Sequence, residues 1–199
     1  MKSTFRVFIA AFVGASVAVA FSQFTPARAK KSDEILVKAR QLDLLNHLLP
    51  LVMTKDQLNK VLGVVEKCRS KVDRIRLDEA NELLKFEPKI DDAINRGVNR
   101  DLVPSKTLMV DLAKNFNAFS IRRQVAAGEN ADDVLAVMKK ELNAGQLKTA
   151  ANSHDLKVYD PNVDPSKLSE DDKLKFYIKD VILDPSCYDL LIKLTKTAG

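Results

Sequence analysis

The sequence predicts an all-α protein, with long amphipathic helices in a helical hairpin or bundle and a short helical extension at the C-terminus. Apolar residues recur at spacings of three and four along most of the chain, which is the repeat of one helix face. No segment has the alternating pattern of a convincing strand. No long block repeats, which argues against a solenoid.

Residues 1–29 are expected to be a cleaved export signal rather than part of the fold. Two basic residues precede an apolar run from Val7 to Phe21, and Ala27 and Ala29 form a small-x-small cleavage site. The run is shorter than the roughly 20 residues that span a bilayer, which favours cleavage over an uncleaved membrane anchor. We therefore expect no membrane insertion once the signal is removed.

Composition and charge exclude several classes of protein. The chain has 199 residues, of which 30% are charged and 46% hydrophobic, with two Cys and no Trp, so it is neither low-complexity nor disulfide-dense. It carries 32 basic and 27 acidic residues, and three of the basic ones lie in the signal, so the remainder has a net charge of +2. Because a nucleic-acid binder needs a concentrated basic face, we expect no nucleic-acid partner.

The first part of the expected helical domain, residues 30–152, begins with two helices. Ser32 can cap the first, and Pro50 ends it. The second carries a narrow apolar seam that suits a partner helix. The seam falters at Glu79 and Glu82, and we expect either one long helix kinked near Pro88 or two helices in line. The seam residues are Leu58, Val61, Val65, Cys68, Val72 and Ile75.

The rest of the chain is expected to continue as shorter helices. A polar connection at residues 97–105 precedes a helix that Ser105 opens and Gly128 stops. Asn130 and Asn143 then each cap a further helix. Residues 153–199 are expected to be a linker plus C-terminal helices packed on the same domain. Within them, the pattern predicts an irregular stretch at 153–168, a helix start at Ser169, a break at 184–186, and a last helix at Tyr188–Leu194.

Two short segments share the pattern of a capping box, in which a cap side chain and the residue three positions later bond to each other's backbone N–H. In both, a Gln stands three residues after the cap, and apolar residues flank the box at the positions of a hydrophobic staple. Helix capping explains this spacing completely, and no catalytic role is needed. The residues are Met53, Thr54, Gln57 and Leu58 in the first segment, and Leu142, Asn143, Gln146 and Leu147 in the second.

The same two segments resemble the paired Leu-Thr-x-x-Gln motifs of the exported, all-helical Spy/CpxP family. The resemblance covers roughly residues 45–153, and the sequence departs from the motif at Met53, where the family has Leu, and at Asn143, where it has Thr. It implies a curved helical hairpin in the bacterial periplasm, often a homodimer. It further implies an ATP-independent chaperone, an envelope-stress adaptor or a metal-stress sensor, with unfolded or partner proteins as ligands.

The sequence favours no enzyme, no cofactor and no metal site. It has no phosphate-binding glycine loop, no nucleophile elbow and no His-Glu-x-x-His motif. The two histidines, His47 and His154, have no His or Cys at ligand spacing. Cys68 and Cys187 leave three alternatives open: a disulfide that ties the last helices to the long one, two separate buried thiols, or intermolecular pairing through Cys187.

Two hypotheses of function follow. The first is a periplasmic chaperone or stress adaptor, motivated by the signal, the two boxes and the charged long helix. The second is a non-catalytic module that binds one dedicated envelope partner, motivated by the apolar seam and by the C-terminal segment outside the resemblance.

Overall fold

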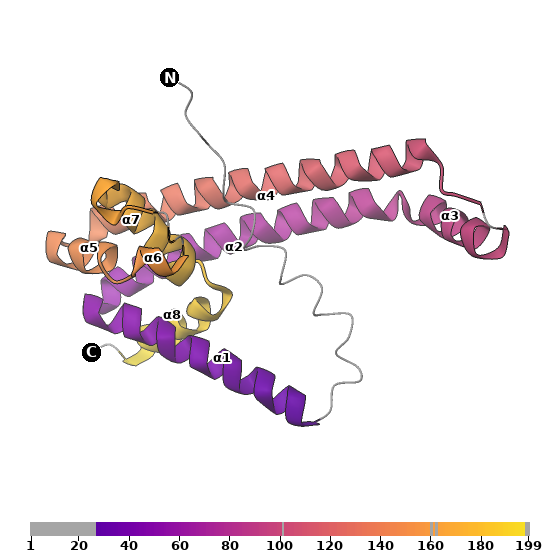
Figure 1. The fold of residues 1–199 in the computed structure, drawn as a ribbon. Coiled ribbons are helices and arrows are strands. Elements are labelled where there is room, and N and C mark those ends of the chain that lie inside the picture. The colour runs from indigo at the N-terminus through magenta and orange to yellow at the C-terminus, as the bar shows by residue number, and fades with distance from the viewer. Residues whose placement is uncertain (1–26, 101, 160, 162, 198–199) are drawn as a thin grey trace, which may run out of the picture. The chain divides into compact units, whose positions relative to one another are not determined.

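A computed structural model describes residues 27–100, 102–159, 161 and 163–197 (Figure 1). Residues 1–26 of the expected export signal lie outside the described residues. The described residues form helices and no strand, which confirms the all-α class.

The chain divides into two compact units at Leu42, within helix α1 (Ala27–Leu48). The part of α1 in the first unit exposes apolar side chains such as Ile35 and Leu36. Among the described residues the helix runs from Ala27, so the expectation that Ser32 caps it is wrong: Ser32 is an internal helical residue. The α-helix ends two residues before Pro50, which lies in the short 3₁₀ helix η2 (Leu49–Leu51).

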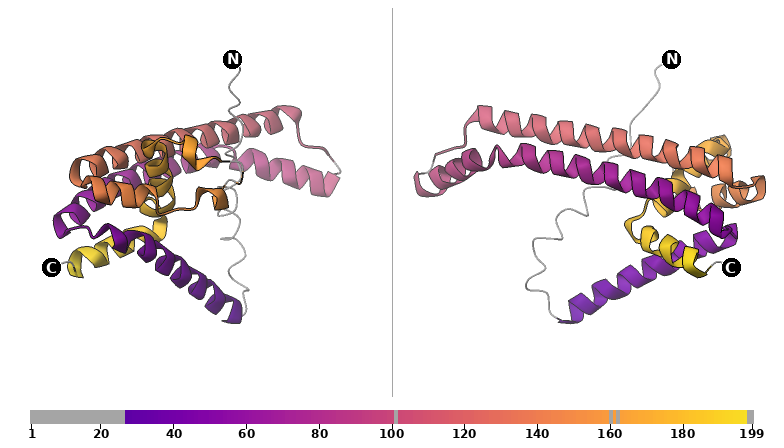
Figure 2. Two further views of the ribbon diagram at one scale, coloured as in Figure 1. Left: turned by 60° about the vertical axis from the view of Figure 1, so that its left-hand side comes forward. Right: turned by 180° about the vertical axis from the view of Figure 1, so that it is seen from behind.

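The second unit, residues 43–199, is built on an antiparallel hairpin of α2 (Lys55–Leu84) and α4 (Lys106–Glu141), which lie side by side in Figures 1 and 2. Helix α3 (Glu87–Arg100) follows α2 at the tip. A proline ring clashes with the carbonyl of the residue four positions earlier, which for Pro88 is Leu84, the last residue of α2. The chain therefore forms two helices here rather than one kinked helix.

Two glycines that were expected outside helices lie inside them. Gly97 is within α3, and Gly128 is within α4, which runs unbroken for 36 residues. The predicted stop at Gly128 and the predicted cap at Asn130 are therefore wrong. Asn130 is buried on the same helix as Ala126 and Val134, so tertiary packing outweighs the weak local preference of glycine against a helix.

The remaining helices gather at the inner end of the hairpin, away from α3 (Figure 2). The elements are α5 (Ala144–Ala151), α6 (Leu156–Tyr159), η3 (Pro165–Lys167), α7 (Glu170–Tyr177), the π-helical turn η4 (Ile178–Ile182) and α8 (Pro185–Thr197). The stretch at 153–168 is not wholly irregular, because it contains α6 and η3. Ser169 caps α7 as expected, and the last helix is longer than predicted because Pro185 occupies its first turn, where proline is well tolerated.

The hydrophobic core of the second unit lies at this inner end. It joins the first half of α2 and the last half of α4 to α5, α7, η4 and α8, so the C-terminal helices share one core with the hairpin. By contrast, Phe119 and Glu79 are the only buried residues among those described between 69 and 125. We call this part, residues 69–100 and 102–125, the outer hairpin.

Candidate functional site

Both capping boxes form, and each closes the start of a helix. Thr54 Oγ1 accepts from the Gln57 N–H at 3.3 Å, and the Thr54 N–H donates to Gln57 Oε1 at 3.0 Å. Asn143 Oδ1 accepts from the Gln146 N–H at 3.0 Å, and the Asn143 N–H donates to Gln146 Oε1 at 2.9 Å. These bonds satisfy N–H groups that helix starts leave without an internal partner.

The two boxes also meet each other, although 89 positions separate their glutamines. Each side-chain Nε2 donates to the other's Oε1 at 3.1 Å. Gln57 Nε2 also donates to the Glu141 carbonyl at 2.7 Å, and Gln146 Nε2 donates to the Leu51 carbonyl at 2.9 Å. Every donor and acceptor of the two side-chain amides is therefore used, and the arrangement is nearly symmetric.

The paired boxes hold the inner end of the hairpin together. The apolar residues that flank them belong to the core or pack against it: Leu58 and Leu142 are buried, and Met53 and Leu147 are partly buried. Neutral amides neither titrate nor attack, so these eight residues form a structural lock rather than a reactive centre.

The predicted seam of α2 is covered from within the chain. Leu58, Val61 and Val65 are buried in the core, while Val72 and Ile75 are half-buried further out. Helix α4 lies along α2, and α8 also contacts it. The seam therefore gives no reason to expect a partner helix from another protein.

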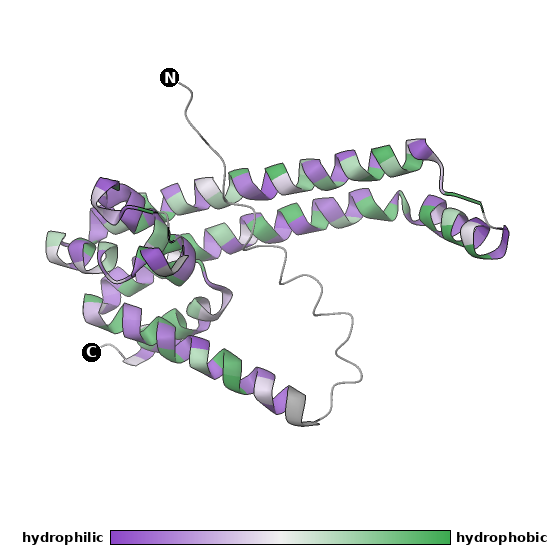
Figure 3. Cartoon of the chain, in the orientation of Figure 1, coloured by the Kyte–Doolittle hydropathy of each residue, from purple (hydrophilic) through white to green (hydrophobic). Residues whose placement is uncertain are grey.

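Most of the large apolar side chains that are exposed in the described residues belong to the outer hairpin. Figure 3 shows hydrophobic residues in green along α2, α3 and α4. A pair of helices can bury only one side of each member. Exposed apolar patches of this kind mark interaction sites in soluble proteins. The large side chains involved are Leu77, Leu84, Ile94, Val98, Leu102, Val103, Met109, Val110, Phe116, Ile121 and Val125.

One face of the outer hairpin carries exposed apolar residues from both long helices, next to the charged residues Asp73 and Arg76 of α2. On each helix, the residue after a seam position is rotated by about 100° around the helix axis from the seam. Because the two helices run antiparallel, these residues lie on the same face of the hairpin. On α2 this places Ala80 and Leu84 after the seam residues Glu79 and Leu83, and on α4 it places Met109 after Leu108. We call this set the apolar rows, which are Leu77, Ala80 and Leu84 on α2 and Met109, Ala113 and Phe116 on α4; all six are exposed.

The opposite face is mixed. Helix α4 contributes Val110, Ile121 and Val125 there, but α2 contributes charged residues, among them Arg74 and Lys85. The two faces therefore differ in what α2 contributes, which is exposed apolar side chains on the first face and polar or charged ones on the second.

Ion pairs fix how α2 and α4 align in the outer hairpin. Glu79, whose side chain is 3% exposed, accepts from Arg123 Nε at 2.8 Å and also pairs with Arg123 Nη2. Arg122 Nη2 donates to Glu82 Oε1 at 3.1 Å. These are the two glutamates that interrupt the apolar seam of α2, so the sequence did mark the two positions. It did not identify the arginines that pair with them, which lie 40 or more positions away. A buried charged group at a seam position specifies register, because a shifted pairing would leave it without a partner.

Cys68 and Cys187 are both buried, and the structure has them as thiols without a disulfide. The Cys68 S–H donates to the Asn130 carbonyl across 3.8 Å. Burial, with a smaller contribution from the Asp133 carboxylate, raises the pKa of the Cys68 thiol. A raised pKa disfavours the thiolate, so Cys68 has the character of a packing residue rather than a nucleophile.

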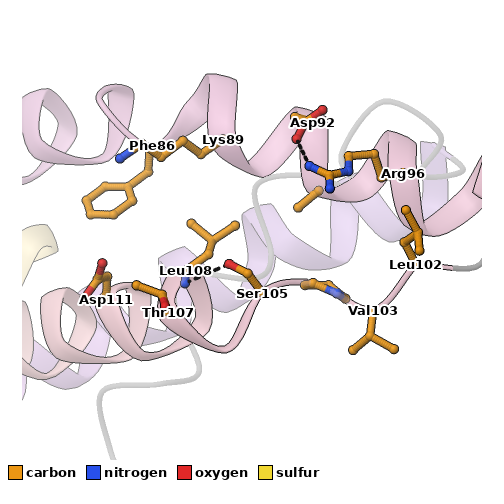
Figure 4. Close-up of a pocket in the computed structure, with 12 residues that line it drawn as sticks. Phe86, Lys89, Asp92, Arg96, Leu102, Val103, Ser105, Thr107, Leu108 and Asp111 are labelled. Atoms are coloured by element: carbon orange, nitrogen blue, oxygen red, sulfur yellow. Dashed lines mark hydrogen bonds and ion pairs between the residues drawn. The ribbon is translucent and has the colours of Figure 1, made fainter.

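A cavity of about 330 Å³ lies at the tip of the outer hairpin, between α3 and the start of α4 (Figure 4). Phe86 and Leu108 give it apolar walls, and Lys89 and Asp111 stand at its rim. The Asp92–Arg96 ion pair, at 3.0 Å, borders it on α3. The cavity is large enough for one apolar side chain of a bound segment.

Within the described residues, no group of three or more His, Cys, Asp or Glu side chains is arranged to hold a metal ion. In the same part of the chain, no helix combines the length and the apolar composition that crossing a membrane requires. The two histidines nevertheless lie together, which their sequence spacing did not suggest: the ring centroids of His47 and His154 are 4.2 Å apart, with 13° between the ring planes.

Comparison of the chain with protein-family models, with curated proteins and with solved structures finds no match. Fold and site thus define a class in structural terms only: an all-helical hairpin with a packed inner end and an exposed, partly apolar outer half.

Proposed function

We propose that this chain is an exported, ATP-independent chaperone of the bacterial periplasm that binds unfolded segments of other proteins on the apolar rows of its outer hairpin. The observation that carries the proposal is the separation of core from exposed apolar surface. The hydrophobic core and the hydrogen bonds between Gln57 and Gln146 hold the inner end together, while the six side chains of the apolar rows lie exposed on one face of the outer hairpin.

The chemistry of the rows suits an unfolded client. Exposed apolar side chains cover the apolar residues that a client leaves in water, and the gain follows the area buried rather than a particular sequence. Ion pairs such as Glu79–Arg123 and Glu82–Arg122 keep α2 and α4 in a fixed register, so the apolar rows remain exposed to solvent. The resemblance to the Spy/CpxP family supports the same function.

The experiment compares two triple variants of equal size. The first, Leu77→Ser/Leu84→Ser/Phe116→Ser, removes apolar groups from the rows. The second, Val110→Ser/Ile121→Ser/Val125→Ser, removes the same kind of group from the mixed face. All six residues are exposed, so both variants should keep the helical circular dichroism of the parent.

Light scattering of a chemically unfolded client, diluted into buffer without nucleotide, gives the readout. The parent and the mixed-face variant should suppress aggregation at a near-equimolar ratio, and the row variant should lose most of that effect. Equal behaviour of the two variants would assign binding to another surface, and a folded parent that suppresses nothing would overturn the chaperone function. That result would favour the alternative function, in which the chain binds one dedicated envelope partner. Capture from envelope extract should then enrich one protein.

A further inference from the structure

The cavity at the tip of the outer hairpin has walls that are fixed by hydrogen bonds within the chain. The Leu102 N–H donates to the Arg96 carbonyl at 3.4 Å, which ties the connection after α3 to that helix. Ser105 Oγ accepts from the Leu108 N–H at 3.2 Å and so fixes the first turn of α4. The Asp92–Arg96 ion pair joins two turns of α3 along the same border (Figure 4). The cavity therefore has its shape before any ligand binds.

Apolar side chains from three parts of the chain line this cavity. Phe86, in the turn between α2 and α3, is half-buried, as are Ala93 of α3 and Leu108 of α4. Leu102 of the connection lines it too and is 45% exposed. The volume of about 330 Å³ lies at the lower end of the range for ligand pockets. These walls favour an apolar occupant, because it would remove them from water.

Two charged side chains at the rim have no partner of opposite charge. The Lys89 ammonium stands over the Phe86 ring, 5.9 Å from its centroid, and among the described residues no carboxylate lies within ion-pair distance of it. In the same part of the chain, no side chain pairs with the Asp111 carboxylate. Figure 4 shows both on the side of the Phe86 ring, away from Leu102 and Val103. Lys89 is thus free to donate hydrogen bonds, and Asp111 is free to accept them.

A donor and an acceptor beside an apolar cavity match the chemistry of a polypeptide segment. Each non-proline residue of a bound segment has one backbone carbonyl, which accepts, and one N–H, which donates. A ligand with a single charge fits less well, because a carboxylate would meet Asp111 and an ammonium would meet Lys89. An aromatic ring would also contact the Phe86 ring and the Lys89 ammonium, and an aliphatic side chain would gain less from these contacts.

The cavity follows directly on the apolar rows. Leu84, the last residue of the row on α2, stands two positions before Phe86, and Met109, the first residue of the row on α4, comes directly after Leu108. A segment that covers the rows can therefore extend into the cavity at their tip end.

We propose that the tip cavity is an anchor site, which takes an aromatic side chain of a bound polypeptide segment while Lys89 donates to a backbone carbonyl and Asp111 accepts from a backbone N–H beside that side chain. The proposal rests on the proposed function, because the segment belongs to the unfolded client that the apolar rows cover. The rows favour any apolar stretch, whereas the anchor site adds a preference for segments that contain Phe or Tyr.

The first test uses small probes in place of a client. N-acetyl-phenylalanine methylamide carries one ring between two peptide groups, and N-acetyl-alanine methylamide lacks the ring. In amide NMR spectra of the purified protein, the phenylalanine probe should shift the signals of residues 86–96 and 102–111 until they saturate. It should bind about fivefold tighter than the alanine probe, or more.

Phenylacetate and phenethylammonium carry the same ring with a single charge, and both should bind more weakly than the phenylalanine probe. Tighter binding of either charged compound would overturn the proposal, because it would assign the cavity to an ionic ligand. The absence of saturable shifts at these residues would overturn it as well.

Variants test whether the probe occupies the cavity itself. Ala93→Phe places a ring in the cavity and should weaken binding of the phenylalanine probe by about tenfold or more. Ala118→Phe makes the same change at an exposed position of α4 outside the cavity and should leave the affinity unchanged. Circular dichroism should show the helical content of the parent in both. Equal affinities of the two variants would overturn the assignment of the cavity.

A double variant tests the rim without filling the cavity. Lys89→Met/Asp111→Leu keeps the approximate size of both side chains but removes the donor and the acceptor, so binding should weaken by about threefold or more. An unchanged affinity would overturn the roles of Lys89 and Asp111.

None of these measurements uses the aggregation of a client. Suppression of aggregation by a protein that binds no probe would overturn the anchor site and leave the proposed function standing. Binding of the phenylalanine probe by a protein that suppresses no aggregation would support the cavity as a site for an aromatic side chain and overturn the proposed function.

Discussion

Gln57 and Gln146 donate hydrogen bonds to each other, each Nε2 to the other's Oε1 at 3.1 Å, and so join the first turns of two helices that are far apart in the sequence. The same oxygens accept from the backbone N–H groups of Thr54 and Asn143. Each amide therefore caps its own helix and binds the other, which couples two local motifs into one long-range contact.

Loss of either glutamine should destabilise the protein, and loss of both should cost less than the sum. Gln146→Ala removes the donor to the Leu51 carbonyl, the bond to Gln57 and part of the cap. We expect a loss of about 2 kcal/mol from the free energy of unfolding, a similar loss for Gln57→Ala, and a coupling of about 1 kcal/mol in the double variant. Urea unfolding of the four proteins measures all three values.

Gln124→Ala is the matched control, because Gln124 is exposed on α4 and its Nε2 makes one long contact of 3.5 Å to Ser120. Its effect should stay within about 0.5 kcal/mol. Additive losses at Gln57 and Gln146 would contradict the coupling.

The sequence predicted well those features that depend on a few neighbouring residues. Thr54, Ser105, Asn143 and Ser169 all cap helices where the pattern indicated, since the cap oxygen and the N–H it accepts from are at most three positions apart. The break before Pro88 follows the same logic, because the proline ring acts on a carbonyl four positions away.

Features that depend on distant packing could not be read in this way. Gly128 has the local chemistry of a helix stop, yet α4 continues because residues on both sides of it are buried against α2 and the C-terminal helices. The His47–His154 stack and the Glu79–Arg123 pair each join residues more than 40 positions apart. Periodicity identifies the helices, but it does not say which residue of one helix meets which residue of another.

Because Gly128 lies in the interior of α4, its replacement by alanine should stabilise the protein. A Cβ at this position would meet no atom within 4 Å, and alanine is favoured over glycine in a helix interior by about 0.5–1 kcal/mol. Thermal unfolding should show a corresponding rise in Tm for Gly128→Ala. At Gly145 a Cβ would come within 3.2 Å of Asn143 Oδ1, the oxygen that caps α5, so Gly145→Ala should gain less or lose stability. An equal rise for both would argue against this account.

Val52 is held in a backbone conformation that β-branched residues avoid. Its φ of 46° and ψ of 48° are left-handed, and its side chain is 80% exposed. Asparagine tolerates this region, so Val52→Asn should raise the free energy of unfolding by about 1 kcal/mol at little packing cost. Val103→Asn provides the comparison, since Val103 is 90% exposed and does not have a positive φ. Denaturant midpoints of the two variants test the difference, and a matching gain at Val103 would mean that strain at Val52 is not the cause.

Tyr177 should make the protein lose stability at alkaline pH. Burial, and to a smaller extent the neighbouring Cys187, raises the pKa of its phenol above the usual value near 10. In the unfolded chain Tyr177 releases its proton as the pH passes that value, while the folded protein retains it. The unfolded state then binds fewer protons, and the free energy of unfolding falls as pH rises, by up to about 1.4 kcal/mol per pH unit. Tyr177→Phe should cost about 1 kcal/mol at pH 7, through the lost bond to the His47 carbonyl, and should make the decline above pH 10 shallower than in the parent. Urea unfolding of both proteins at pH 7, 9 and 10.5 measures the two slopes, and parallel declines would assign the alkaline loss to groups other than Tyr177.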